Sequence, residues 1–123
     1  MRSPCHHVIA FLFIFPILLL SQIISHTEVY DNGNIKSIFY HQKVGNEIKK
    51  IKCEEFFENG NKYRSGSFKN NRKSGVWIEW NQDGKKISEG NYKDGNWKYW
   101  YDTGAMIKEE IHENGKMKIE KWY

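Results

Sequence analysis

Asparagine–glycine and aspartate–glycine dipeptides recur along most of the chain and constrain its fold more than any other feature. They occur at Asn32-Gly33, Asn59-Gly60, Asp83-Gly84, Asp94-Gly95 and Asn114-Gly115, with Thr103-Gly104 in an equivalent place. Such dipeptides favour type I′ turns, in which both central residues have positive φ. The segments between them are short and rich in Trp, Tyr, Ile and Phe, which is typical of β-strands. The sequence therefore predicts a series of antiparallel β-hairpins.

Consecutive hairpins also resemble one another in sequence. Residues 75–80 (GVWIEW) align with residues 95–100 (GNWKYW), and an earlier copy places Gly60 where the next copy has Gly84. Internal repeats of this size are supersecondary units that are too small to fold alone. Frequent Gly and Asn also disfavour long helices. We therefore expect an all-β fold, a single-layer twisted antiparallel meander of repeated β-hairpins.

Pairing the strands across two-residue turns predicts which residues lie opposite each other. A large ring opposite a glycine would cover the backbone that the glycine exposes. In this register Cys53 takes the place that Trp77 holds in the next repeat, which favours a packing role for the cysteine. The predicted pairs are Trp77 with Gly90, Trp80 with Ile87, Trp100 with Ile107 and Cys53 with Gly66.

The repeats resemble the MORN-repeat variant family, a bacterial group that includes YwqK-type antitoxins. The best copy runs through Gly75-Val-Trp-Ile-Glu-Trp80, Asp83-Gly-Lys85 and Glu89-Gly-Asn-Tyr92. The resemblance covers about residues 54–117 well and 28–53 loosely. In the last copy Glu110 replaces a glycine of the pattern and His112 replaces its aromatic residue. The resemblance implies a hairpin meander that binds protein partners, and it supplies no catalytic residues.

The N-terminal segment has a different character from the repeats. Residues 8–20 form an apolar run that follows Arg2 and precedes a polar stretch, which is typical of a secretory signal. We predict a signal peptide or an N-terminal membrane anchor helix over residues 1–25, a divergent hairpin region over 26–53 and the repeat domain over 54–123. The protein is then expected to be exported, and to be periplasmic, secreted or anchored to the membrane.

The remaining polar residues show no pattern that predicts chemistry. The Asp residues lie at or beside turns, where turn geometry explains them. The His residues lack metal-ligand spacing, and no glycine-rich loop precedes a helix. Lys and Arg (19) are interspersed with Asp and Glu (15), which is unlike the basic stripe of a nucleic-acid-binding protein. We expect no enzymatic activity, cofactor or metal, and neither nucleic acid nor a small-molecule substrate as partner.

Aromatic residues, 15% of the chain, are the main candidates for function. They can form the core of a thin sheet, or an exposed patch that recognises a protein, because Tyr and Trp bury much area at low entropic cost. A platform that stacks sugars is a third interpretation. The candidate partner-binding residues are Trp77, Tyr92, Trp97, Tyr99 and Tyr101.

Two functions follow from these observations. The first is an exported, non-catalytic protein that acts by protein–protein interaction, and one form of it is an antitoxin or immunity protein that occludes a toxin. The alternative is an envelope structural module or a module that binds the membrane surface. Its basis is the basic, aromatic composition and the apolar N-terminal segment.

Overall fold

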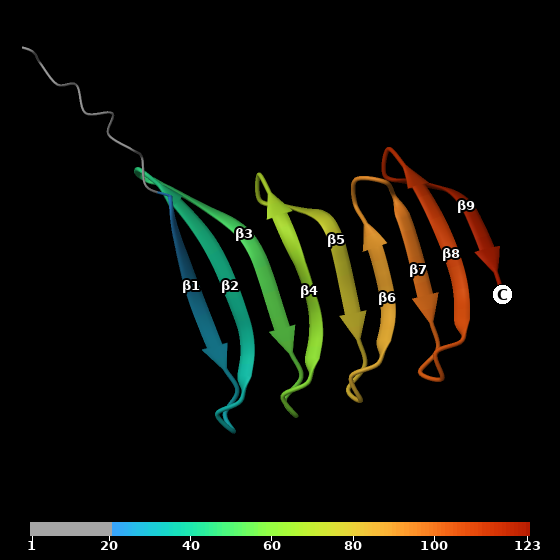
Figure 1. The fold of residues 1–123 in the computed structure, drawn as a ribbon, viewed down its shortest axis with the longest axis horizontal. Coiled ribbons are helices and arrows are strands. Elements are labelled where there is room, and N and C mark those ends of the chain that lie inside the picture. The colour runs from blue at the N-terminus through green and yellow to red at the C-terminus, as the bar shows by residue number, and fades with distance from the viewer. Residues whose placement is uncertain (1–20) are drawn as a thin grey trace, which may run out of the picture.

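The computed structural model describes residues 21–123, which are coloured in Figure 1. Within this range the chain forms strands and no helix, and so no helix that is long and apolar enough to span a membrane. Most of the predicted signal or anchor helix, residues 1–20, lies outside the described residues. The strands are β1 (Gln22–Val29), β2 (Ile35–Val44), β3 (Glu47–Phe56), β4 (Lys62–Lys69), β5 (Arg72–Trp80), β6 (Lys86–Asn91), β7 (Asn96–Trp100), β8 (Met106–Glu113) and β9 (Lys116–Trp122).

The nine strands form one open antiparallel sheet in which each strand pairs with the next along the chain. β1 and β9 are its two edges, and the strands follow one another across the molecule in Figure 1. The single-layer hairpin meander predicted from the sequence is therefore confirmed. The predicted boundaries after residues 25 and 53 fall inside β1 and β3. The first boundary follows the end of the apolar segment and the second follows the repeat similarity, and both remain predictions.

One face of the sheet holds the small core. Cys53 and Trp77 are the buried apolar residues of the described chain, with 2% and 3% of their surfaces exposed. They belong to a row of directly paired residues, which share a face because paired side chains point the same way. We name this side the tryptophan face. The row consists of Phe39, Cys53, Gly66, Trp77, Gly90, Trp97 and Glu110.

Most Asx-Gly turns differ from the predicted type I′ turn. At Asp83-Gly84 only the glycine has positive φ, 82°, and its N–H donates to the Asn81 carbonyl at 3.0 Å. This is the geometry of a type I turn followed by a left-handed glycine, which adds one residue to the loop. The predicted pairing next to these turns is therefore wrong: Trp80 pairs with Lys86 and Trp100 with Met106.

Type I′ turns do occur at the other ends of the strands, in the hairpins that join β4 to β5 and β8 to β9. Asn114 and Gly115 both have positive φ, 52° and 75°, as predicted for that dipeptide. Asn70 and Asn71 also have positive φ, 51° and 60°, and they form a similar two-residue turn between β4 and β5. Asn tolerates this conformation better than other non-glycine residues because its short side chain bonds locally.

The longer turns lie side by side at the lower ends of the strands in Figure 1, and hydrogen bonds join neighbouring turns. The amides of Asn59 and Asn61 both donate to the Gln82 carbonyl, at 3.0 and 2.7 Å. Asn32 and Asn34 donate to the Glu58 carbonyl in the same way, at 3.1 and 2.8 Å. These bonds join successive repeats outside the strands and satisfy carbonyls that the turns leave free.

Tryptophan rings cover two glycines of the tryptophan face. The predicted pairs Cys53 with Gly66 and Trp77 with Gly90 are confirmed. The ring that covers Gly90, however, belongs to Trp97: a Cβ at Gly90 would lie 2.0 Å from its Cδ2. Trp77 covers Gly66 instead, where a Cβ would lie 2.2 Å from the ring. Each ring thus leans over the strand that precedes its own.

The Gly90→Val substitution should therefore destabilise the sheet by displacing Trp97. Overpacking of this kind costs about 1–3 kcal/mol or more, so we expect a clearly lower melting temperature by circular dichroism. Ser65→Val is a suitable control, because Ser65 lies in the adjacent row on the other face and is half-buried. Equal melting temperatures for the two variants would contradict this placement of the Trp97 ring.

Candidate partner-binding surface

Four rings form a continuous row across the tryptophan face. Neighbouring rings are nearly perpendicular, at 86°, 85° and 87°, with centroids 5.3, 6.3 and 5.1 Å apart. Edge-to-face contacts at such distances are favourable beyond the area that they bury. The row stabilises a sheet that has no second layer. We name it the aromatic row, and its members are Phe68, Trp77, Tyr92 and Trp97.

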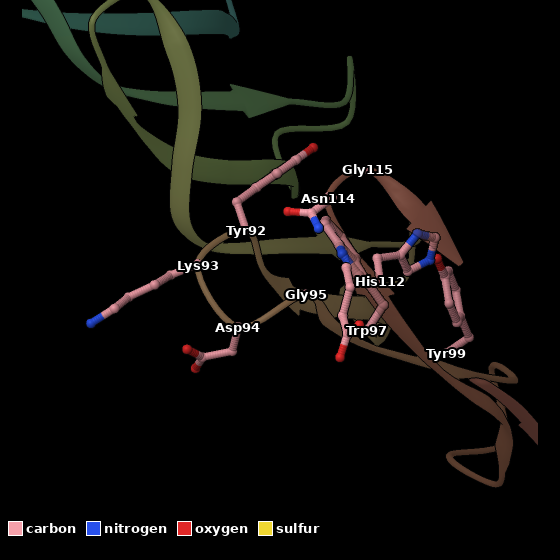
Figure 2. Close-up of a pocket in the computed structure, with 10 residues that line it drawn as sticks. Tyr92, Lys93, Asp94, Gly95, Trp97, Tyr99, His112, Asn114 and Gly115 are labelled. Atoms are coloured by element: carbon pink, nitrogen blue, oxygen red, sulfur yellow. The ribbon is translucent and has the colours of Figure 1, made fainter. Parts of the chain in front are cut away.

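An open pocket of about 890 Å³ lies at the β7 end of this row (Figure 2). One wall is the four-residue loop between β6 and β7, and the other is the hairpin of β8 and β9. The Gly95 carbonyl accepts a hydrogen bond from the His112 N–H at 2.8 Å, which holds the two walls together. We name it the loop pocket. It is lined by Tyr92, Lys93, Asp94, Gly95, Trp97, Tyr99, His112, Glu113, Asn114 and Gly115.

A buried carboxylate lies beside the loop pocket. Glu110 is 8% exposed, and its carboxylate contacts the Lys108 ammonium, the His112 ring at 2.9 Å and the Tyr99 hydroxyl at 3.2 Å. Lys108 and then His112 hold the pKa of Glu110 below the ordinary 4.5, because their hydrogen bonds favour the charged form. A carboxyl group with a lowered pKa is a poor general acid near neutral pH. These charged side chains are therefore better placed to stabilise the fold than to transfer a proton.

Glu110 should make the stability of the sheet depend on pH. Since its folded-state pKa is lowered, its contribution is present above about 4.5 and is lost as the pH falls through the folded-state value. We expect Glu110→Gln to lose less stability than the unmodified protein between neutral and acidic pH, in urea unfolding at a series of pH values. Glu58→Gln serves as the control, because Glu58 is exposed. Parallel stability profiles for the protein and Glu110→Gln would count against this network.

The structure separates the predicted partner-binding residues into two groups. Tyr92, Trp97 and Tyr99 meet in the loop pocket (Figure 2), and Tyr92 is 45% exposed. Trp77 is only 3% exposed, so it supports the aromatic row from within. Tyr101 is 55% exposed but begins the turn between β7 and β8, and it does not line the pocket.

Sequence reasoning did not identify the polar residues of this site. Glu110 pairs directly with Trp97, at a position where earlier repeats have glycine, and His112 replaces an aromatic residue. These two departures from the repeat pattern were the only sequence features that could have indicated a polar cluster here. Turn geometry explained Asp94, and Glu113 was not identified as a candidate. Only the folded chain places them at the same pocket.

No metal site is formed by the described residues. In residues 21–123, His, Cys, Asp and Glu side chains do not gather in groups of three or more that could hold an ion. Cys53 is buried and forms no disulfide in this range. Burial raises the pKa of its thiol, which keeps it in the unreactive protonated form.

Comparison with known proteins supports the repeat assignment. The family model described as MORN repeat variant matches residues 50–70 and 73–94, which are similar to two copies of that repeat. No curated protein and no solved structure gave a significant match. The matched residues run from β3 into the loop after β6, and so they include the first three rings of the aromatic row. Repeats of this family are generally non-catalytic binding modules.

Proposed function

We propose that this chain is a non-catalytic repeat protein that binds a protein partner at the loop pocket. The observation that carries the proposal is the exposure of aromatic rings there: Tyr92 is 45% exposed, and Trp97 and Tyr99 are half-buried in an open pocket. Tyrosine and tryptophan contribute disproportionately to the binding energy of protein interfaces. The hydrogen-bonded walls keep the rings in place before binding, which lowers the entropic cost of association.

An antitoxin or immunity protein is the specific form of this function that we propose. The similarity to MORN-variant repeats motivates it. The apolar residues 8–20 are typical of an export signal, and an immunity protein against an exported toxin would require export. In such a protein the aromatic surface would act by covering the partner, so no catalytic group is needed.

Affinity purification with matched variants tests the binding function. The tagged full-length protein, Tyr92→Leu and Tyr101→Leu would each be cross-linked in the native host and purified, and the captured proteins identified by mass spectrometry. We expect one stoichiometric partner that is retained by Tyr101→Leu and lost by Tyr92→Leu. Capture of the same proteins by all three would contradict binding at the loop pocket.

A second candidate function, binding to a membrane surface, is favoured by the other face of the sheet. Lysines and rings alternate there: Lys62 Nζ lies 5.8 Å from the Trp80 ring, and Lys86 Nζ lies 5.7 Å from the Trp100 ring. Amphipathic rings and lysines together suit the interface of an anionic membrane. Co-sedimentation with anionic vesicles at low salt tests this function. Absence of the full-length protein from the vesicle pellet would exclude it.

A further inference from the structure

Lysine side chains cover most rings of the tryptophan face. Lys50 Nζ lies 4.6 Å from the Phe39 ring and 5.1 Å from the Phe68 ring. Lys73 Nζ lies 4.4 Å from the Trp77 ring. Lys50 and Lys73 form no salt bridge within residues 21–123, so the rings are their main partners. This face therefore attracts cations, as electron-rich ring faces do.

The loop pocket departs from this pattern. No Lys or Arg from the described part of the chain lies over the rings of Tyr92 and Trp97, although Lys108 covers the neighbouring Tyr99 ring at 5.2 Å. Tyr92 and Trp97 form the last pair of the aromatic row, 5.1 Å apart. They pack like the other rings of the row, but no lysine of residues 21–123 covers them as Lys50 covers Phe68 and Lys73 covers Trp77.

Loop length explains the difference between the two repeats. Lys73 follows the two-residue turn Asn70-Asn71 and lies within β5, where its side chain reaches Trp77. Its counterpart in the next repeat, Lys93, lies in the four-residue loop between β6 and β7. Its side chain points away from Trp97 in Figure 2. The longer loop thus leaves these rings open to a cation from outside the chain.

Two acidic residues and one lysine, Lys93, line the loop pocket together with the two rings. Asp94 and Glu113 line the loop pocket and form no salt bridge with another side chain of residues 21–123. Glu110 lies beside the pocket behind Tyr99, and its charge is paired with that of Lys108. The lining therefore carries two carboxylates and one ammonium group, an excess of negative charge, whereas the chain as a whole has a net charge of +4.

We propose that the loop pocket receives an arginine side chain of the protein partner. A guanidinium group can stack flat on an aromatic ring and pair with a carboxylate. The pocket lining supplies both kinds of group, the rings of Tyr92 and Trp97 and the carboxylates of Asp94 and Glu113. Lysine offers a point charge without the flat surface. This inference rests on the proposed function and adds the chemistry that the partner must present at its contact point.

The test uses peptides that differ only in charge. The full-length protein, with its tryptophans labelled with ¹⁵N, would be titrated with a Gly-Arg-Gly-Arg-Gly peptide and followed by NMR at the Trp97 indole N–H. The same peptide with citrulline in place of arginine keeps the shape and removes the charge. We expect saturable shifts with arginine and at least a several-fold weaker response with citrulline. Because the protein is basic, nonspecific attraction of the arginine peptide is disfavoured.

Variants locate the binding. Tyr92→Leu removes one ring, and the double variant Asp94→Asn with Glu113→Gln removes the acidic groups. Each should weaken arginine-peptide binding by about three- to thirty-fold, the range of a single cation–π or charge-assisted contact. Tyr101→Leu, which alters an exposed tyrosine outside the pocket, should bind as the unmodified protein does.

Three outcomes would overturn the inference. In the first, the citrulline peptide binds as tightly as the arginine peptide. In the second, Tyr92→Leu binds the arginine peptide as tightly as the unmodified protein does. In the third, phosphatidylcholine vesicles shift the Trp97 signal and the arginine peptide does not. The last would assign the pocket to a lipid headgroup. The proposed function is tested separately: a partner captured by affinity purification that depends on Tyr92 but not on Asp94 and Glu113 would keep that function and refute the arginine contact.

Discussion

Gly95→Ala is expected to destabilise the protein by about 2–5 kcal/mol, the sum of left-handed backbone strain and a steric clash. Gly95 has a φ of +69°, which L-residues rarely adopt. A Cβ there would lie 1.8 Å from the His112 carbonyl oxygen, which belongs to the backbone of β8 and has little room to move. Relief of the clash would separate the two walls of the loop pocket. Urea unfolding followed by circular dichroism measures the effect.

Gly84→Ala provides the matched control for this substitution. Gly84 also follows an aspartate and has a positive φ, +82°, but no atom lies within 4 Å of the Cβ position. We expect a loss of about 1–2 kcal/mol, which is the conformational strain alone. If both variants lost the same stability, the contact between Gly95 and β8 would not exist as described.

Trp77→Ala should cost about 3–5 kcal/mol, as truncation of a buried aromatic residue usually does. The Trp77 ring is 3% exposed, covers Gly66, and donates a hydrogen bond from Nε1–H to the Ser67 carbonyl at 3.1 Å. Its loss would open a gap in the middle of the aromatic row. A domain of this size is stable by only about 5–10 kcal/mol, so this variant is expected to be partly unfolded at 37 °C.

Trp122→Ala removes an equal ring from the edge strand β9 and should cost less than about 1 kcal/mol, because exposed positions contribute little. Trp122 is 62% exposed. A comparison of the two melting temperatures tests whether the buried rings of the tryptophan face stabilise the fold more than an exposed ring of the same face does. A loss as large for Trp122→Ala as for Trp77→Ala would show that burial does not govern these contacts.

The hairpin pattern was predictable from the sequence because turn dipeptides and apolar strands recur together. The pairing was correct in mid-strand, as for Cys53 with Gly66, and wrong beside the turns, as for Trp80. An Asx-Gly dipeptide fits either a two-residue turn or a longer turn that ends in a left-handed glycine. The dipeptide alone does not distinguish the two, and the longer form shifts the register by one residue.

The packing of the tryptophan rings could not be derived from pairing alone. Gly90 lies between Trp77 and Trp97 in the cross-strand row, so pairing permits either ring to cover it. The direction in which a ring leans depends on side-chain rotamers and on the neighbouring rings. The regular perpendicular contacts of the aromatic row fix that direction for all its members.

The candidate site was predictable only in its aromatic part. Tyr92, Trp97 and Tyr99 were identified as interaction residues, and the fold brings them together at the loop pocket. Its acidic residues, Asp94 and Glu113, come from the loop after β6 and from the end of β8, so their proximity depends on the order of the strands. Glu110 and His112 were visible as departures from the repeat, but their contact with each other required the folded sheet.

Site-specific photo-crosslinking tests most directly whether a partner binds at the loop pocket. p-Benzoylphenylalanine would replace Tyr92, Tyr101 or Trp80 in the full-length protein, one position at a time, in the native host. Tyr92 lies at the pocket, Tyr101 outside it and Trp80 on the opposite face. We expect a single cross-linked protein from position 92 and none from positions 80 and 101. A cross-linked partner from position 80, with none from position 92, would contradict binding at the loop pocket and place the interaction on the other face.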